Sequence, residues 1–126
     1  RTILRGLQES GVPSIHFATG NPALLPLLAE AGGDAIGLDW RIEIDEAWDL
    51  LGPAVAIQGN LDPVSLLAGS KIAVSRADDI LRKVRGRPGH IFNVGHGILP
   101  ETDPDVVRAV VDHVHSIDLA ALRKEA

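Results

Sequence analysis

Apolar residues gather in four short runs along the chain, and each run is followed by residues that start helices. The runs cover residues 14–18, 35–38, 54–57 and 90–94. Runs of this length, bounded by glycine and proline, predict four strands. After three of them comes a capping residue with a proline, the pair that favours the first turn of a helix. These pairs are Asn21-Pro22, Asp62-Pro63 and Asp103-Pro104.

Helices are expected before, between and after these strands. The pattern predicts them over residues 2–11, 22–31, 45–51, 76–84 and 105–124, with Asp45 as the cap of the third and a further turn after Asp62-Pro63. The last helix is predicted to be the longest. Its six aliphatic residues lie within about 140° of arc, which is typical of an amphipathic helix that covers a core. They are Val106, Val107, Val110, Val111, Val114 and Ile117.

Strands that are apolar nearly throughout and alternate with helices are typical of a parallel sheet. A complete (β/α)8 barrel has about 250 residues, or about 31 for each strand and helix unit. The 126 residues therefore correspond to four units. Neither a GxGxxG nor a Walker loop follows a strand, which counts against a nucleotide-binding doubly wound sheet. The expected fold is α/β, with four consecutive βα units that form half of a TIM (β/α)8 barrel.

The composition is typical of a globular protein and suggests neither a membrane nor a nucleic-acid partner. Hydrophobic residues make up 45% of the chain and charged residues 23%, and no apolar run approaches the roughly 20 residues that cross a bilayer. A net charge of −5 without a basic run leaves no surface for nucleic acid. The lack of cysteine excludes disulfides and thiolate metal sites and is compatible with the cytoplasm. Because the chain opens on Arg1 without a methionine, and residues 2–11 resemble a helix rather than a signal peptide, we expect it to begin inside a longer protein.

In barrels of this type the chemistry takes place at the carboxyl ends of the strands. The residues that follow the four runs are Thr19-Gly20-Asn21, Asp39-Trp40-Arg41, Gln58-Gly59-Asn60-Leu61-Asp62 and Gly95-His96-Gly97. Helix capping accounts for Asn21 and Asp62. Asp39 follows a buried strand, where a carboxylate needs a partner such as a loop amide or Arg41. Trp40 is expected to be a core or interface anchor rather than a platform for a substrate.

The roles of two carboxamides stay undecided, and two histidines are expected to be structural. Gln58 and Asn60 either orient a ligand or tie neighbouring loops together, and the sequence favours neither role. His16, inside the first strand, is expected to be an interior histidine with its hydrogen bonds satisfied. His90 is expected to begin the fourth strand, near the opposite end of the barrel.

His96 is the candidate for chemistry. It stands between Gly95 and Gly97, and glycine permits positive φ and close approach of the backbone to a ligand. Imidazole donates hydrogen bonds to carboxylates when protonated and exchanges protons near neutral pH. Spacing alone leaves a catalytic histidine and a turn residue as nearly equal alternatives.

Three of these segments, in this order and at these separations, resemble the uroporphyrinogen decarboxylase family of haem biosynthesis. They are Gly37-Leu38-Asp39-Trp40, Gln58-Gly59-Asn60-Leu61-Asp62-Pro63 and Phe92-Asn93-Val94-Gly95-His96-Gly97. The similarity extends from about Gly11 to His115 and corresponds to the carboxyl-terminal part of a family member. It implies that residues 1–126 are the C-terminal half-barrel of a single decarboxylase domain.

The resemblance also implies an activity and a site. Family members remove carbon dioxide from the four acetate side chains of uroporphyrinogen III to give coproporphyrinogen III. They act as cytoplasmic homodimers without metal or organic cofactor, because a protonated pyrrole serves as the electron sink. By the matching motif, His96 is the catalytic and substrate-contacting residue, and Gly95, Gly97, Gln58 and Asn60 are further candidates for substrate contact.

The resemblance places the family's other substrate contacts before Arg1, namely an arginine-rich loop, an aspartate, a tyrosine and a serine. Many relatives also carry a lysine near the turn where this chain has Phe17-Ala18-Thr19-Gly20. We therefore expect the fragment alone to be inactive, since a surface of charge −5 does not attract an octa-acid.

Two alternatives to the decarboxylase hypothesis are considered. A corrinoid-linked methyltransferase of the same superfamily would bind zinc through a histidine and two cysteines, and this chain has no cysteine. A non-catalytic half-barrel would associate with another copy through its open edges and its apolar inner face.

Overall fold

Four parallel strands form a single sheet in the computed structural model, which describes residues 2–124. The strands are β1 (Ile15–Phe17), β2 (Ala35–Gly37), β3 (Ala56–Leu61) and β4 (His90–Val94). The helices are α1 (Thr2–Gln8), α2 (Leu25–Ala31), α3 (Ile44–Leu51), α4 (Ser70–Val84), α5 (Pro104–Ser116) and α6 (Leu119–Lys124), with the 3-10 turns η1 (Pro22–Leu24) and η2 (Pro63–Ala68). The strands pair in chain order, β1-β2-β3-β4. The predicted α/β fold with four strand and helix units is confirmed.

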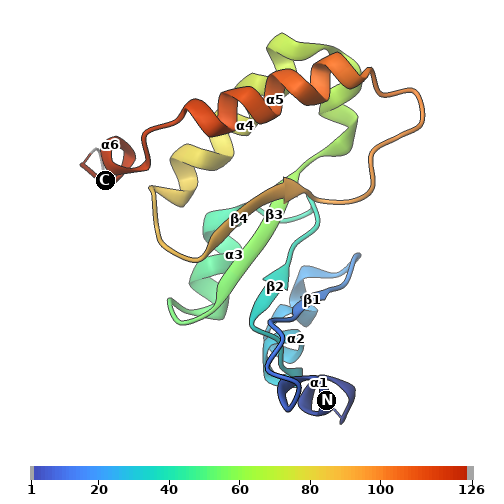
Figure 1. Cartoon of the computed structure of the whole chain (residues 1–126), viewed down its shortest axis with the longest axis vertical. Helices are drawn as coiled ribbons and strands as arrows, with labels where there is room; N and C mark the ends of the chain where they lie inside the picture. The colour runs from blue at the N-terminus through green and yellow to red at the C-terminus, as the bar shows by residue number, and fades with distance from the viewer. Residues whose placement is uncertain (1, 125–126) are drawn as a thin grey trace.

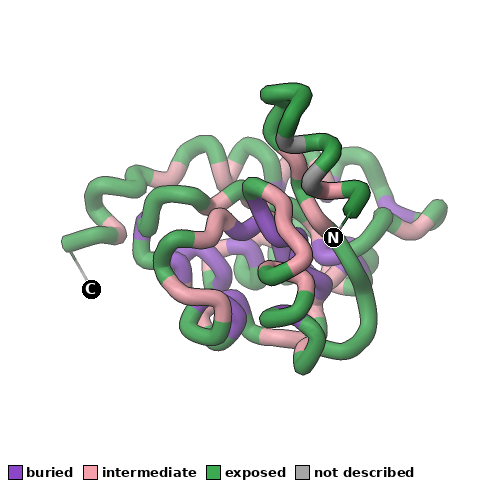
Figure 2. Tube along the Cα trace, turned by 90° about the horizontal axis from the view of Figure 1, so that it is seen from below, coloured by how far each residue is buried: buried purple, intermediate pink, exposed green. Residues whose placement is uncertain are grey.

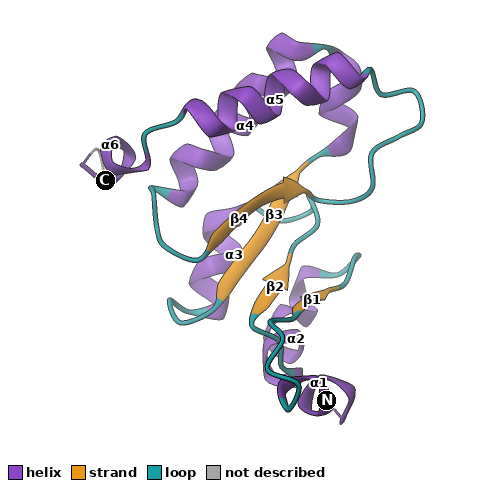
Figure 3. Cartoon of the chain, viewed as in Figure 1, coloured by secondary structure: helices purple, strands orange, loops and turns teal. Residues whose placement is uncertain are grey.

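The helices form one outer layer along the sheet. Figure 1 shows α2 and α3 behind the strands, and α4 and α5 side by side beyond the β3–β4 edge. Successive helices contact one another, α2 with α3, α3 with α4, and α4 with α5. Figure 3 shows the same arrangement with the strands in orange. This layer covers one face of the sheet.

The other face of the sheet is open and partly apolar. The strand register places Phe17, Gly37, Gln58 and Ile91 in one row across the four strands. Phe17 is 44% exposed and Ile91 is 45% exposed. A Cβ on Gly37 would lie 2.8 Å from the Phe17 ring, so glycine at this position lets the phenylalanine lie across β2.

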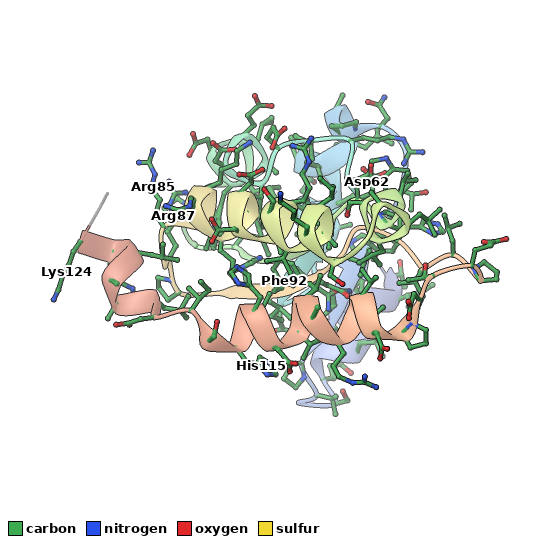
Figure 4. All side chains as sticks on the ribbon, turned by 90° about the horizontal axis from the view of Figure 1, so that it is seen from above. Asp62, Arg85, Arg87, Phe92, His115 and Lys124 are labelled. Carbon is green, nitrogen blue, oxygen red and sulfur yellow. The ribbon has the colours of Figure 1, made fainter. Side chains whose placement is uncertain are left out.

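The hydrophobic core lies between the sheet and the helices. Figure 2 shows the buried segments gathered in the middle of the molecule, with both ends of the described chain exposed. The largest fully buried side chains are Ile36, Leu38, Ile44, Ile57 and Leu61. Phe92 of β4 extends the core between α4 and α5 (Figure 4). No helix within residues 2–124 has both the length and the apolar content to cross a membrane.

The third strand lies further along the chain than predicted. The prediction of a strand over 54–57 is wrong, because β3 covers Ala56–Leu61. Gln58 and Asn60 are therefore strand residues and do not belong to the loop after it. The strand continues through Gln58-Gly59-Asn60 because it is central in the sheet and pairs with β4 as far as Leu61 and Val94.

The helix predicted over 2–11 ends at Gln8, and two other predicted helices differ more from the structure. α4 begins at Ser70 and not at residue 76, because the fully buried Ala73 extends its apolar face toward the amino end. The helix predicted over 105–124 is interrupted after Ser116, where Ile117 has an extended conformation, and Asp118 accepts a hydrogen bond from the Ala120 amide at the start of α6. The longest helix is consequently α4, with 15 residues.

The capping predictions are confirmed at three positions and wrong at one. The side chains of Asn21, Asp62 and Asp103 each accept a hydrogen bond from a backbone amide two residues later. Asp45 is not a cap, because α3 begins one residue earlier, with Glu43 at the N-cap position and without a side-chain cap. Asp45 instead lies in the first helical turn, where a carboxylate stabilises the helix through its interaction with the helix dipole.

Candidate functional site

A hollow of about 600 Å³ lies on the open face of the sheet, toward the carboxyl ends of the strands. Its lining is mostly apolar, with an imidazole and two carboxamides as the polar groups. The residues that line it are Ile15, Phe17, Leu38, Gln58, Asn93, Val94, His96, Gly97 and Ile98. A concave, largely apolar surface with a few polar groups is typical of a small-molecule site.

His96 leaves the sheet directly after β4. The Gly95 amide donates to the Leu61 carbonyl at 2.7 Å, so the pairing of β3 with β4 continues one residue beyond the last strand position. His96 is exposed, and no hydrogen bond to its imidazole is found among residues 2–124. Both ring nitrogens are therefore available to a ligand in the hollow.

The two glycines that flank His96 differ in their surroundings. A Cβ on Gly95 would lie 2.6 Å from the Trp40 nitrogen and 3.0 Å from the Asp39 carbonyl carbon, so only glycine allows this contact between backbones. A Cβ on Gly97 would meet no atom within 4 Å. Neither residue has the positive φ that glycine permits. Gly95 is required for close packing and not for its φ.

Asp39 is the buried carboxylate that anchors the turn after β2. It is 6% exposed and accepts hydrogen bonds from the Gly20 amide at 2.8 Å, the Arg41 amide at 2.9 Å and Nη1 of Arg41 at 2.7 Å. Burial alone would raise the pKa of Asp39, but the hydrogen bonds from Gly20 and Arg41 and the guanidinium charge outweigh it and hold the pKa below its ordinary value. The expected pairing of Asp39 with a loop amide and Arg41 is confirmed.

Trp40 lies beside the candidate histidine. Its ring centroid is 5.9 Å from that of His96, with the two planes at 86°. The Arg41 guanidinium carbon lies 4.1 Å from the Trp40 ring centroid. Trp40 is only half-buried and does not belong to the core, so the first of its two expected roles, a core anchor, is wrong. The second, an interface anchor, stays a prediction. The core indole is that of Trp48, whose Nε1 donates to the Val55 carbonyl at 3.0 Å.

The two candidate amides have different positions. Gln58 lines the hollow with His96. Asn60 is buried, and its Nδ2 donates to the carbonyls of Asp39 at 2.9 Å and Ile42 at 2.6 Å. Of the two roles left open for these residues, tying neighbouring loops together is the one that the structure supports for Asn60.

The histidines of β1 and β4 are structural. Nδ1 of His16 donates to the carbonyls of Leu28 at 3.2 Å and Gly32 at 3.1 Å, so this ring nitrogen is satisfied as expected, although the residue is only half-buried. His90 begins β4, and its Nε2 donates to the Gly59 carbonyl at 2.9 Å. Burial lowers the pKa of His90, and the hydrogen bond to Gly59 offsets only part of this shift.

Sequence reasoning missed several residues of the hollow. Asn93 and Ile98 were not candidates, and neither were Ile15 and Phe17 of β1. The period-2 alternation of β4 contains the missing signal, because Ile91 and Asn93 are exposed while Phe92 packs against the core. Among the described residues, no group of three histidine, aspartate or glutamate side chains is placed to hold a metal ion.

Four parallel strands with their helices on one side, and a hollow on the open face, define this chain as an α/β protein. The family model described as "Uroporphyrinogen decarboxylase (URO-D)" matches residues 1–117. The chain belongs to this family.

Curated relatives agree with the family match. The chain is 53% identical over 125 residues to the uroporphyrinogen decarboxylase of Sorangium cellulosum, 51% over 114 residues to that of Koribacter versatilis and 46% over 116 residues to that of Streptomyces coelicolor. These alignments cover 99%, 90% and 92% of this chain. They cover 36%, 32% and 33% of the relatives, so the chain spans about a third of their length.

Proposed function

We propose that this chain is the carboxyl-terminal part of a cytoplasmic, homodimeric uroporphyrinogen decarboxylase and that it contributes His96 to the substrate site. The observation that carries the proposal is the imidazole of His96, which lines the hollow without a hydrogen bond to any described residue. The family match and the names of the relatives supply the reaction.

The open face of the sheet supports the proposal that residues 1–126 form half of a (β/α)8 barrel. Ile15, Phe17 and Ile91 would be interior residues once further strands complete the barrel. Each is 44 to 47% exposed in this chain, and burial contributes about 25 cal/mol for each Å² of apolar surface. The strands β1 and β4 are the two edges to which the remaining strands would pair.

The proposed reaction removes one carboxyl group at a time from the acetate side chains. The bond between the methylene carbon and the carboxylate breaks, carbon dioxide leaves, and the electron pair neutralises the protonated pyrrole. A proton added to the methylene carbon gives the methyl group, and the ring releases the proton it had gained. In this proposal His96, which lines the hollow, donates a hydrogen bond to a substrate carboxylate.

A chimera tests the proposed function. Residues 1–126 replace the matching segment of the Sorangium cellulosum enzyme, the relative at 53% identity, and the conversion of uroporphyrinogen to coproporphyrinogen is followed by chromatography of the oxidised porphyrins. We expect activity in the chimera and a loss of about a hundredfold in kcat/KM for His96→Ala.

His115→Ala is the matched control, because His115 is exposed on α5 and points away from Phe92 and the core (Figure 4). This variant should retain the activity of the chimera. A folded chimera without activity would contradict the proposed function. Full activity of His96→Ala would contradict the role of His96.

A further inference from the structure

We infer that Trp40 is a positioning residue for His96. This inference rests on the proposed function, because it concerns the orientation of the imidazole that we expect to contact the substrate. The two rings form an edge-to-face pair, with centroids 5.9 Å apart and planes at 86°. Aromatic pairs of this geometry contribute about 0.5–1.5 kcal/mol.

The His96 side chain has few other restraints. It is exposed, and no hydrogen bond to its ring is found within the described chain. An enzyme whose catalytic imidazole rotates freely reacts more slowly, since a misplacement of about 1 Å can lower the reaction rate about a hundredfold. The ring of Trp40 is the one side-chain aromatic contact recorded for His96 among residues 2–124.

Trp40 is itself held in place through Arg41 and Asp39. The Arg41 guanidinium lies over the indole at 4.1 Å and donates from Nη1 to Asp39 at 2.7 Å. The buried Asp39 carboxylate is fixed by the amides of Gly20 and Arg41. The indole therefore belongs to a set of contacts that extends from the β1 turn to the β2 turn.

The backbone next to His96 also packs against Asp39 and Trp40. Gly95 lies against the Asp39–Trp40 peptide, closely enough that a Cβ would come within 2.6 Å of the Trp40 nitrogen. Both the chain direction at His96 and the plane of its ring consequently depend on residues 39–40. A displacement of the β2 turn would move the histidine.

The two aromatic rings line different concavities. His96 lines the hollow on the open face of the sheet, whereas Trp40 lines a separate groove with residues of η2 and α4. A ligand in the hollow would thus contact His96 but not Trp40. The role inferred for Trp40 is to act through His96 and not on the substrate.

The test compares Trp40→Leu, Trp40→Phe, His96→Ala and the double variant Trp40→Leu/His96→Ala in the chimera described above. Trp40→Leu removes the aromatic contact and should lower kcat by about tenfold to a hundredfold with KM changed by less than about threefold. Trp40→Phe keeps an aromatic ring and should recover most of the lost kcat. Val111→Ala, on an exposed position of α5, is the control and should match the parent.

The double variant distinguishes positioning from general structural damage. If Trp40 acts through His96, Trp40→Leu should have almost no further effect on kcat once His96 is alanine. Effects that multiply in the double variant would overturn the inference. An unchanged kcat in Trp40→Leu would also overturn it.

Histidine NMR of the 126-residue chain gives a readout that does not depend on turnover. In Trp40→Leu the imidazole protons of His96 should lose the ring-current shift of the indole, while the signals of His16 and His90 stay in place. Unchanged His96 shifts would contradict the positioning role. If the shift is lost in the 126-residue chain but His96→Ala keeps full activity in the chimera, the contact is supported and the proposed role of His96 is refuted.

Discussion

Alanine at position 95 tests whether the His96 turn depends on backbone contact with the end of β2. The new Cβ would lie 2.6 Å from the Trp40 nitrogen and 3.0 Å from the Asp39 carbonyl carbon, well inside the 3.4 Å at which ordinary contact begins. Both atoms belong to the backbone, so a change of side-chain rotamer cannot relieve the overlap. Overpacking of this kind costs about 1–3 kcal/mol.

The substitution has an opposing effect on the unfolded chain. Replacing glycine with alanine at a compatible position stabilises a protein by about 0.4–1 kcal/mol, because the unfolded chain has fewer conformations. Gly95 does not have a positive φ, so no backbone strain is added to the overlap. The expected net effect of Gly95→Ala is a destabilisation of about 1–2 kcal/mol.

Gly97→Ala is the matched control on the other side of the histidine. It lacks a positive φ and has no atom within 4 Å of the new Cβ. Only the effect on the unfolded chain remains, so this variant should be as stable as the parent or more stable by up to about 1 kcal/mol. The two substitutions are chemically identical and are predicted to have opposite signs.

Urea unfolding measured by tryptophan fluorescence and circular dichroism gives both free energies of unfolding. In the chimera, Gly95→Ala should also lower kcat, since the shifted turn carries His96 away from Trp40, whereas Gly97→Ala should not. A Gly95→Ala variant as stable as the parent would refute the close-packing argument. Equal losses for the two variants would refute it as well.

Three further predictions concern the buried ionisable groups and the open sheet face. Burial holds the pKa of His90 below its ordinary value of 6.5, so below that pH the unfolded chain binds more protons than the folded chain. The free energy of unfolding should therefore fall as the pH drops from 6.5 toward the lowered folded pKa. Urea unfolding at about pH 7.5 and about pH 5 should show this loss, and His90→Gln should remove it. Asp39→Asn should lower the free energy of unfolding by about 2 kcal/mol at neutral pH. Because the pKa of Asp39 is lowered, the stability that its carboxylate provides is present above the ordinary pKa of 3.8 and is lost as the pH falls through the folded pKa. The parent and the variant should therefore converge in urea titrations at lower pH. Phe17→Ser should reduce self-association of the isolated chain in light scattering, whereas Leu50→Ser, on the exposed side of α3, should not; equal association of the two variants would argue against the open face as the contact.

The element order could be predicted from sequence because the local signals are strong. Proline after an asparagine or aspartate marks three helix starts, and each of these caps is present. The bounds of β3 and α4 could not be predicted in the same way. The polar residues of β3 are strand residues only because its neighbours supply hydrogen bonds, and the buried face of α4 begins with Ala73 and Ala77, which are too small to give an apolar signal.

The candidate histidine could be found from sequence, but its surroundings could not. The flanking glycines single out His96, but the sequence does not show which of the two packs against the backbone of residues 39–40. The contact between Trp40 and His96 joins the turns after β2 and β4, which are 56 residues apart in the sequence and meet only because both strands pair with β3. Such contacts depend on turn conformations that the hydrophobic pattern does not specify.

The hollow has too few cationic groups to pair with all the carboxylates of the proposed substrate. His96 is the one ionisable side chain among the described residues that line it, and the nearby Arg41 is already paired with Asp39 and stacked on Trp40. An octa-acid substrate would bring several carboxylates to this surface, and each one that is buried without a partner costs several kcal/mol. One imidazole can satisfy only one of them. The cations for the other carboxylates must come from residues outside this lining, and the portion of the relatives that this chain does not span is where we expect them.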